Sequence, residues 1–365
     1  MKERRIIALL GRRDAPTDAI EEYCQFLGEA LRAYDCELEL ARVPWVEQGW
    51  PAAMRELDRQ ARDWRGRWVL VQYTALAWSE RGFPLRFLRV SRVLRQAGAR
   101  VAMVYHDALP YHGSRTIDKL RRRAQTYAMS EALQSSDLAV FTIPISKVSW
   151  VGPKHKRAVF IPVGANLRDP ESAWKMLQNE TKETRAIAVY GITGGEAGVW
   201  EIASISEALH VVTERMGKLR LVVMGRNAET AEKALKSLMG KLPVEIRVRG
   251  ILPGEEIVRE MGACDVLLFV RGGISSRRGS AIAGIACGLP VVAFDCPETG
   301  SPITEAGVVF ADAKRQRGLG EALLKVLTDQ EYRASLAALS RRAQEKYFSW
   351  KAIAARYAEA LQVDG

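Results

Sequence analysis

The fold of this chain is decided by residues 264–294, CDVLLFVRGGISSRRGSAIAGIACGLPVVAF. The uninterrupted apolar run Val266–Val270 predicts a strand covered on both faces, as in a parallel sheet with helices on each side. Gly288 is typical of a helix end, and Leu289–Val292 predicts the next strand. The stretch therefore predicts the strand–loop–helix–strand unit of a doubly wound α/β domain.

The loop of this unit, residues 271–280, has the composition of a phosphate site. Its glycines allow a ligand close to the backbone, and its serines can cap the helix that follows. A helix start attracts anions, and a guanidinium meets two phosphate oxygens at once. The alternative is an ordinary turn of a doubly wound domain, in which the paired arginines Arg277 and Arg278 are only solvated.

Length and composition predict two globular domains, because the chain has 365 residues, of which 48% are hydrophobic. No apolar run approaches the roughly 20 residues that span a bilayer. The segment Met1–Arg5 leads directly into a short strand rather than a signal peptide, so we expect a cytoplasmic protein. The five cysteines lack C-x-x-C spacing, so we expect reduced thiols in the core rather than a zinc site or disulfides.

Positive charge is concentrated in the first half of the chain. Residues 1–167 hold 27 Lys and Arg against 18 Asp and Glu, whereas residues 168–365 hold 27 against 25. The basic residues cluster at 81–100 and 119–123, which suits an anionic membrane surface or a phosphorylated acceptor. Nucleic acid is not an expected partner, because no recognised binding motif accompanies these residues. A solvated helix face is the alternative.

Residues 1–167 read as a first doubly wound unit. Strands are expected at 5–10, 36–41, 68–73, 100–105, 138–142 and 158–161, with helices that include 50–64 and 114–133. The buried strand 100–105 brings His106 and Asp107 to the carboxyl end of the sheet, where ligands of open parallel sheets bind. A loop histidine held only by backbone is the alternative. Thr17 or Asp18 is expected to cap the helix after the first loop, and Asp18 with Glu21 fits the reciprocal capping pattern, in which case both would be purely structural.

Residues 168–349 read as a second unit, with strands expected at 186–190, 220–224 and 245–249 before the stretch quoted above. The first turn of this unit, 191–198, is rich in glycine but matches neither the phosphate-loop nor the dinucleotide pattern. Two helices within about 318–346 precede a last amphipathic helix that ends at Leu361.

Four motifs of the second half resemble those of family 4 glycosyltransferases. They are Gly262–Val266, Ala286–Val292, Glu305–Gly307 and Phe348–Trp350. In the first half the match is looser, and it rests on the glycine-bearing loop after the first strand, on His106 and on Ile161–Gly164. The resemblance implies the GT-B fold, an α/β architecture of two doubly wound Rossmann-like domains, 1–167 and 168–349, that face a central cleft. The C-terminal helix 350–363 is then expected to pack back on the first domain.

Two customary donor contacts of that family are missing here. Its paired glutamates would fall on Ser275 and Ala283, and its phosphate-binding Arg and Lys on Ile192 and Ala197. We therefore expect Arg277 and Arg278 to neutralise the donor diphosphate from a different direction.

The resemblance implies transfer of a sugar from a nucleotide-sugar donor to a glycan, a lipid-linked molecule or a small molecule, with retention at the anomeric carbon and no metal or other cofactor. The basic first domain would hold the acceptor, and the enzyme could bind peripherally to the inner face of a membrane. The expected catalytic residues are His106, Asp107, Arg277 and Arg278. The expected donor-binding residues are Gly191, Gly194, Gly195, Arg226, Gly272, Gly273, Ile274, Ser275, Ser276, Gly279 and Ser280. The expected acceptor-side loop comprises Gly11, Arg12, Arg13, Asp14, Thr17 and Asp18.

Two other functions are compatible with the sequence. A relic that binds a nucleotide sugar but has lost catalysis would explain Ser275 and Ala283. A nucleotide-sugar epimerase also uses two such domains, but it would need acid and base groups in the cleft, and the chain has only four histidines. A turnover assay separates the three functions.

Overall fold

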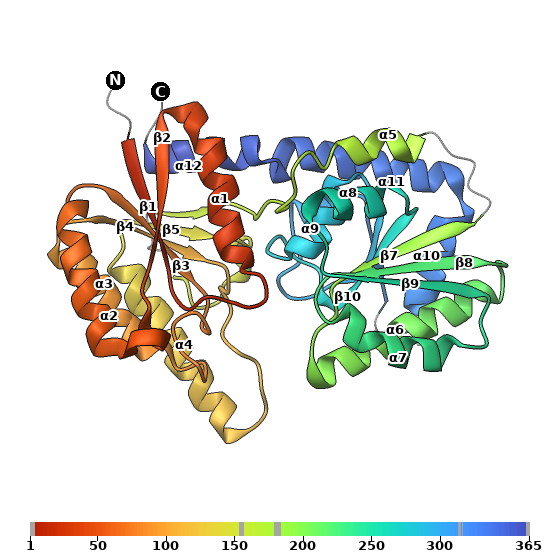
Figure 1. Ribbon diagram of the computed structural model, residues 1–365, viewed down its shortest axis with the longest axis horizontal. Coiled ribbons are helices and arrows are strands. Elements are labelled where there is room, and N and C mark those ends of the chain that lie inside the picture. Colours follow the sequence, from red (N-terminus) through yellow and green to blue (C-terminus); the bar gives the residue numbers. More distant parts are fainter. Residues whose placement is uncertain (1–3, 153–156, 179–183, 313–314, 316, 363–365) are drawn as a thin grey trace. The chain divides into compact units, whose positions relative to one another are not determined.

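Two six-stranded parallel sheets organise the chain (Figure 1). The computed structural model describes residues 4–152, 157–178, 184–312, 315 and 317–362. These residues form two units, one within Met1–Pro162 and Trp350–Gly365 and the other within Val163–Ser349. The division falls five residues before the expected boundary at 167, and Val163 already pairs within the second unit, where its N–H donates to the Ser276 carbonyl oxygen at 3.1 Å. The expected helix end at 363 lies outside the described residues.

The first unit has the strand order β2-β1-β3-β4-β5-β6, with all pairs parallel. Its strands are β1 (Arg4–Leu10), β2 (Cys36–Arg42), β3 (Trp68–Tyr73), β4 (Arg100–Tyr105), β5 (Leu138–Phe141) and β6 (Ala158–Phe160). Its helices are α1 (Ala19–Leu31), α2 (Trp45–Ala61), α3 (Phe87–Gln96), α4 (Thr116–Gln134) and α12 (Trp350–Leu361). Helix α2 begins five residues before the expected start at 50, and its backbone is kinked at Gly49, which has φ of +73°.

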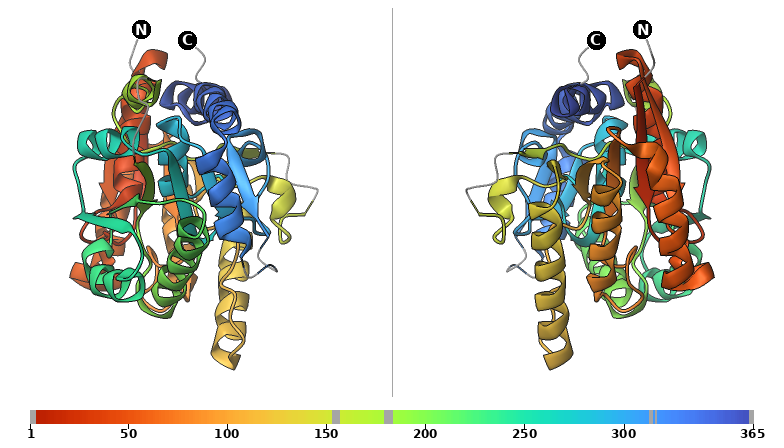
Figure 2. Two further views of the ribbon diagram at one scale, coloured as in Figure 1. Left: turned by 90° about the vertical axis from the view of Figure 1, so that its right-hand side faces the viewer. Right: turned by 90° about the vertical axis from the view of Figure 1, so that its left-hand side faces the viewer.

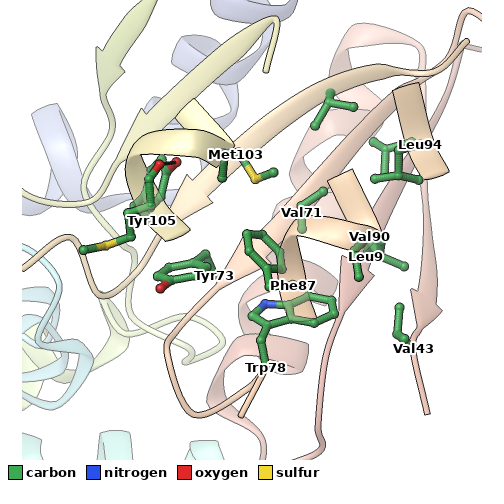
Figure 3. Close-up of a cluster of buried hydrophobic side chains, with 14 of the residues drawn as sticks. Leu9, Val43, Val71, Tyr73, Trp78, Phe87, Val90, Leu94, Met103 and Tyr105 are labelled. Carbon is green, nitrogen blue, oxygen red and sulfur yellow. Dashed lines mark hydrogen bonds between the residues drawn. The ribbon is translucent and has the colours of Figure 1, made fainter. Parts of the chain in front are cut away.

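The core of this unit is built on the central strands, whose side chains are buried on both faces. All six residues of β3 and five of the six residues of β4 are buried. Aromatic rings fill the layer beneath α3, where Phe87 lies between Tyr73 and Trp78 at centroid distances of 5.2 and 4.9 Å (Figure 3). The Trp78 indole N–H donates to the Gln72 carbonyl oxygen at 2.9 Å, so its polar atom is satisfied in the core. This packing fixes the end of β4 from which His106 extends.

The last helix, α12, completes the first unit although it is far from it in sequence. Its Trp350 ring stacks on Phe26 of α1 at 5.5 Å, and the hydroxyl groups of Tyr23 and Tyr357 are hydrogen-bonded at 2.9 Å. At its other end, the Trp68 indole N–H donates to the Leu361 carbonyl oxygen at 3.0 Å. Figures 1 and 2 show α12 in dark blue beside the red helix α1. Aromatic burial and two buried hydrogen bonds therefore hold the chain end on the first sheet.

The second unit has the strand order β12-β11-β10-β7-β8-β9, again with all pairs parallel. Its strands are β7 (Arg185–Tyr190), β8 (Leu219–Met224), β9 (Val244–Gly250), β10 (Val266–Gly273), β11 (Val291–Phe294) and β12 (Val308–Ala311). Its helices are α5 (Ser172–Gln178), α6 (Gly195–Thr213), α7 (Ala228–Met239), α8 (Gly254–Gly262), α9 (Gly279–Ala286), α10 (Gly318–Thr328) and α11 (Gln330–Ala343).

The stretch that predicted the fold forms the expected strand, loop, helix and strand. Strand β10 is longer than expected, however, because it continues through Arg271 and Gly272 to Gly273, with a register shift against β11 between Phe269 and Gly273. Cys24, Cys36, Cys264 and Cys287 are buried free thiols. Among the described residues, no helix is both long and apolar enough to cross a membrane.

Candidate functional site

At the carboxyl edge of the second sheet, the turns that follow β7 and β8 are hydrogen-bonded to each other. The Gly191 N–H donates to the Met224 carbonyl oxygen at 2.7 Å, and the Ile192 N–H donates to the Arg226 carbonyl oxygen at 3.0 Å. The Asn227 side-chain amide returns a hydrogen bond to the Ile192 carbonyl oxygen at 2.8 Å. These contacts fix the backbone of the turn at the edge where ligands of parallel sheets bind.

The glycines of this turn let helix α6 pack closely on it at one position and leave open space beside it at another. A Cβ atom on Gly198 would lie 2.0 Å from the Thr193 carbonyl oxygen, so the first turn of α6 packs directly on the loop. Gly195, in contrast, has φ of +66°, and among the described residues outside its chain neighbours and the nearby backbone of α6 no atom lies within 4 Å of where its Cβ would be. The Thr193 N–H donates to the buried Glu201 carboxylate at 2.7 Å. The loop is thus held from the α6 side and open at Gly195.

Arg271 is the first residue of the expected loop 271–280 but was not among the expected site residues, and it reaches over this turn from the end of β10. Its Nη1 lies 3.1 Å from where a Cβ on Gly191 would be, and its Nε is buried without a hydrogen-bond partner in the described part of the chain. Burial lowers the pKa of Arg271; the charge of Glu201 opposes this shift, and the positive charge of Arg226 adds to it. The sequence signal was an arginine at the end of a buried strand, where a charge faces the sheet's ligand-binding edge.

In the loop between β10 and α9, Arg277 forms an ion pair that the sequence analysis did not foresee. Its Nε and Nη2 donate to the two Glu298 carboxylate oxygens at 2.7 and 2.9 Å, and the Ser275 hydroxyl donates to the same carboxylate at 3.0 Å. In this structure the guanidinium fork that we expected on the diphosphate therefore engages a buried carboxylate. The catalytic role of Arg277 stays a prediction.

The other residues assigned to this loop differ in exposure. Ile274, Ser275 and Ser276 are buried, Gly273, Arg278 and Ser280 are half-buried, and Gly272 and Gly279 are exposed. The Arg278 Nη2 lies 3.9 Å from where a Cβ on Gly272 would be, and the charge of Arg278 also contributes to the lowered pKa of Glu298. The action of Arg277 and Arg278 as a pair on one diphosphate stays a prediction.

In the first unit, His106 and Asp107 lie at the carboxyl end of β4, as expected. Their N–H groups both face the Tyr73 carbonyl oxygen, at 3.0 and 3.4 Å. The His106 Nε2 lies 2.8 Å from Oε1 of the buried Gln72, and its ring meets Tyr23 edge-on at 5.1 Å. Because the Gln72 amide NH₂ donates to the Leu70 carbonyl oxygen, its Oε1 is the acceptor and His106 Nε2 carries the proton. His106 is thus positioned by the core beneath it.

The loop assigned to the acceptor, residues 11–18, is held by Arg42. The Arg42 guanidinium donates to the Gly11 carbonyl oxygen at 2.8 Å and to the carboxylates of Asp18 and Glu21 at 3.1 and 2.8 Å. Asp18 also caps α1 by accepting from the Ile20 and Glu21 N–H groups, both at 3.2 Å, so the expected cap by Asp18 is confirmed, whereas the Glu21 carboxylate accepts from Arg42. The Arg12 N–H donates to the Ala77 carbonyl oxygen at 2.8 Å. Of the other assigned residues, Thr17 is half-buried and Arg13 and Asp14 are exposed.

The comparisons with known proteins agree with this architecture. Residues 199–329 match the family described as glycosyl transferases group 1. A comparison with curated proteins gives no match.

Solved structures resemble both units together. The Anabaena protein HepE in complex with UDP and glucose has 14% identity and a TM-score of 0.67, covering 98% of this chain and 99% of its own. Sucrose-phosphate synthase from Thermosynechococcus elongatus has 18% identity and a TM-score of 0.69, with 98% of each chain covered. A putative UDP-N-acetylglucosamine 2-epimerase from Listeria monocytogenes has 12% identity and a TM-score of 0.63, covering 99% of this chain and 96% of its own. At these identities the likeness concerns the fold: the chain has the GT-B fold, and its second unit resembles the glycosyl transferases group 1 over residues 199–329.

Proposed function

We propose that the protein is a glycosyltransferase that moves a sugar from a nucleotide-sugar donor to an acceptor. The observation that carries this proposal is the match of residues 199–329 to a glycosyltransferase family in the unit whose carboxyl edge presents arginines over a glycine turn. An enzyme of this kind must hold a diphosphate and stabilise the charge that grows on it as the glycosidic bond breaks. Guanidiniums and backbone N–H groups supply that stabilisation, so the proposed reaction needs no metal.

The donor is proposed to bind at the second unit and the acceptor at the first. HepE has been solved with UDP and glucose, which makes UDP-glucose the first donor to test. His106 and Asp107 are proposed to contact the transferred sugar, and the loop 11–18 is proposed to contact the acceptor. Retention at the anomeric carbon, and a glycan, lipid-linked or small-molecule acceptor, complete the proposal.

The test is a turnover assay with a panel of nucleotide sugars, each with and without candidate acceptors. Nucleoside diphosphate release together with an acceptor of increased mass would support the proposal, and the anomeric proton coupling of the product would report retention. Diphosphate release without a sugar-bearing acceptor would identify a hydrolase instead.

A nucleotide-sugar epimerase is the second candidate, because the Listeria protein of that description shares the fold at a TM-score of 0.63. The same assay separates the two functions, since an epimerase returns an altered nucleotide sugar with its diphosphate intact. Tight nucleotide-sugar binding without any turnover would instead indicate a binding protein, which the serine and alanine at positions 275 and 283 would explain.

We also propose that the first unit binds peripherally to anionic membrane surfaces. The support is an exposed basic face on α3, where Arg89, Arg92 and Arg95 are exposed, together with the exposed Arg86 just before the helix. The arginines of α4 that the sequence analysis singled out contribute less, because Arg121 pairs with Asp118 at 2.7 Å and Arg122 donates to the Tyr111 carbonyl oxygen at 3.3 Å.

A further inference from the structure

We infer that Arg271, together with Arg226, binds the diphosphate of the donor at the turn Gly191–Gly195. The inference rests on the proposed function and deepens it, because it assigns the donor's charged group to Arg271 and Arg226 rather than to the expected pair Arg277 and Arg278.

Arg271 and Arg277 differ in how their charges are matched by the protein. Within the described residues, no carboxylate oxygen lies within 4.0 Å of its nitrogens, and its buried Nε has no hydrogen-bond partner. Arg277, in the neighbouring loop, has its charge matched by Glu298 instead. A partly buried guanidinium without a carboxylate at ion-pair distance is costly, and a bound anionic ligand would offset that cost.

Charged side chains of both signs act on Arg271. Arg226 is close enough that its positive charge lowers the pKa of Arg271, while Glu201 is the acidic group that acts on Arg271 in the opposite sense. Glu201 is itself buried and accepts the Thr193 N–H, so its charge is already partly used by the loop. Two guanidiniums, those of Arg271 and Arg226, therefore act on this edge, and together they suit a dianionic group.

The turn that Arg271 contacts leaves space for a ligand beside Gly195. Arg271 lies against the Gly191 backbone, and the space beside Gly195 is open for at least 4 Å from where its Cβ would be. Helix α6 begins at Gly195 without a side-chain cap, so its first N–H groups add donors at the same edge. A diphosphate laid along this turn would meet the Arg271 fork on one side and backbone N–H groups on the other.

The experiment measures binding of inorganic pyrophosphate, UDP and uridine to the wild type, Arg271→Gln, Arg271→Lys and Arg226→Gln by calorimetry. Arg342→Gln, which removes the charge of an exposed arginine of α11, is the matched control. We expect Arg271→Gln to weaken pyrophosphate and UDP binding by about 10- to 100-fold, with Arg271→Lys intermediate because it keeps the charge but loses the fork. Uridine affinity and the control should be unchanged.

Melting curves distinguish ligand binding from a structural role of Arg271, because loss of a structural contact would lower the melting temperature of Arg271→Gln. Removing an unmatched charge should leave the ligand-free melting temperature of Arg271→Gln unchanged or higher. Unchanged diphosphate affinity in Arg271→Gln, a lower melting temperature with unchanged affinity, or no pyrophosphate or UDP binding by the wild type would each overturn the inference. Diphosphate binding through Arg271 without any sugar transfer would contradict only the proposed function. Sugar transfer at the full rate in Arg271→Gln would contradict only the inference about Arg271.

Discussion

The Arg277–Glu298 pair shows how a single residue can couple the candidate site to stability. Burial disfavours the ionised form of Glu298, but hydrogen bonds and charge from Arg277 outweigh it and lower the pKa of Glu298 below its usual value of 4.5. A lowered pKa means that the folded state binds the proton less tightly than the unfolded state, so the pair stabilises the protein above about pH 4.5 and this contribution is lost as the pH falls through the lowered pKa.

We therefore predict that Glu298→Ala lowers the free energy of unfolding at pH 7 by about 3–5 kcal/mol, because it removes the carboxylate that both hydrogen-bonds and balances the charge of the partly buried Arg277. Denaturant unfolding of the wild type and the variant at pH 7, 5, 4 and 3 measures this, and the difference should shrink toward pH 3. Glu207→Ala, which removes an exposed carboxylate of α6, is the control and should change stability little. A difference that grows as the pH falls would contradict the assignment.

His106 is the residue for which structure and catalysis must be separated experimentally. Because its Nε2–H donates to the buried Gln72, we predict that His106→Ala destabilises the fold by about 1–3 kcal/mol as well as lowering kcat. Combining His106→Ala with Gln72→Leu removes the stranded acceptor, so it should recover much of the stability without recovering turnover. Urea unfolding and steady-state kinetics on the four proteins of this cycle give both quantities. Recovery of turnover along with stability would show that His106 acts only through the fold.

At the scale of elements, the docking of α12 depends on the hydroxyl pair between Tyr23 and Tyr357. Both side chains are buried, so Tyr357→Phe leaves the Tyr23 hydroxyl without this partner, and we predict a loss of about 1–3 kcal/mol. The double variant Tyr23→Phe and Tyr357→Phe should lose less than the single variant, because two apolar rings replace a satisfied pair. Tyr127→Phe, in a ring that is 54% exposed, is the control for the same atom change. Additive losses in this unfolding cycle would argue against the contact.

At the scale of the whole molecule, the uneven charge predicts salt-dependent binding to anionic vesicles. Arginines near such a surface contribute about 1 kcal/mol each, so we expect Arg89→Gln with Arg92→Gln to weaken binding to phosphatidylglycerol vesicles by about 30-fold. Arg121→Gln should have less effect on binding, because Arg121 is engaged by Asp118. The control is Arg215→Gln with Arg342→Gln in the second unit, where both side chains are exposed. Vesicle flotation at rising salt measures the effect, and equal binding to neutral vesicles would contradict it.

The sequence by itself determined the strands and the sheet edge, because these depend on local patterns. Val266–Val270 and Val101–Tyr105 are continuous apolar runs that can only be buried on both faces, and they form β10 and β4. The same patterns placed His106 at a strand end, and the Asp18 cap was readable from four consecutive residues. Element ends were less certain: β10 continues into Arg271 and Gly272 because pairing with β11 resumes at Gly273 after a register shift.

The partners of the charged and polar side chains were decided only by the tertiary structure. The Arg277 and Glu298 side chains meet across 21 residues of sequence, and Tyr23 and Tyr357 across 334. Arg271 lies over Gly191 because β10 and β7 are neighbours in the second sheet, although a long stretch of sequence separates them. Local composition states that a guanidinium is present at a loop or strand end. Whether that guanidinium pairs with a carboxylate or is left to bind a ligand depends on the distant segments that the strand order places beside it. No local sequence pattern encodes that placement.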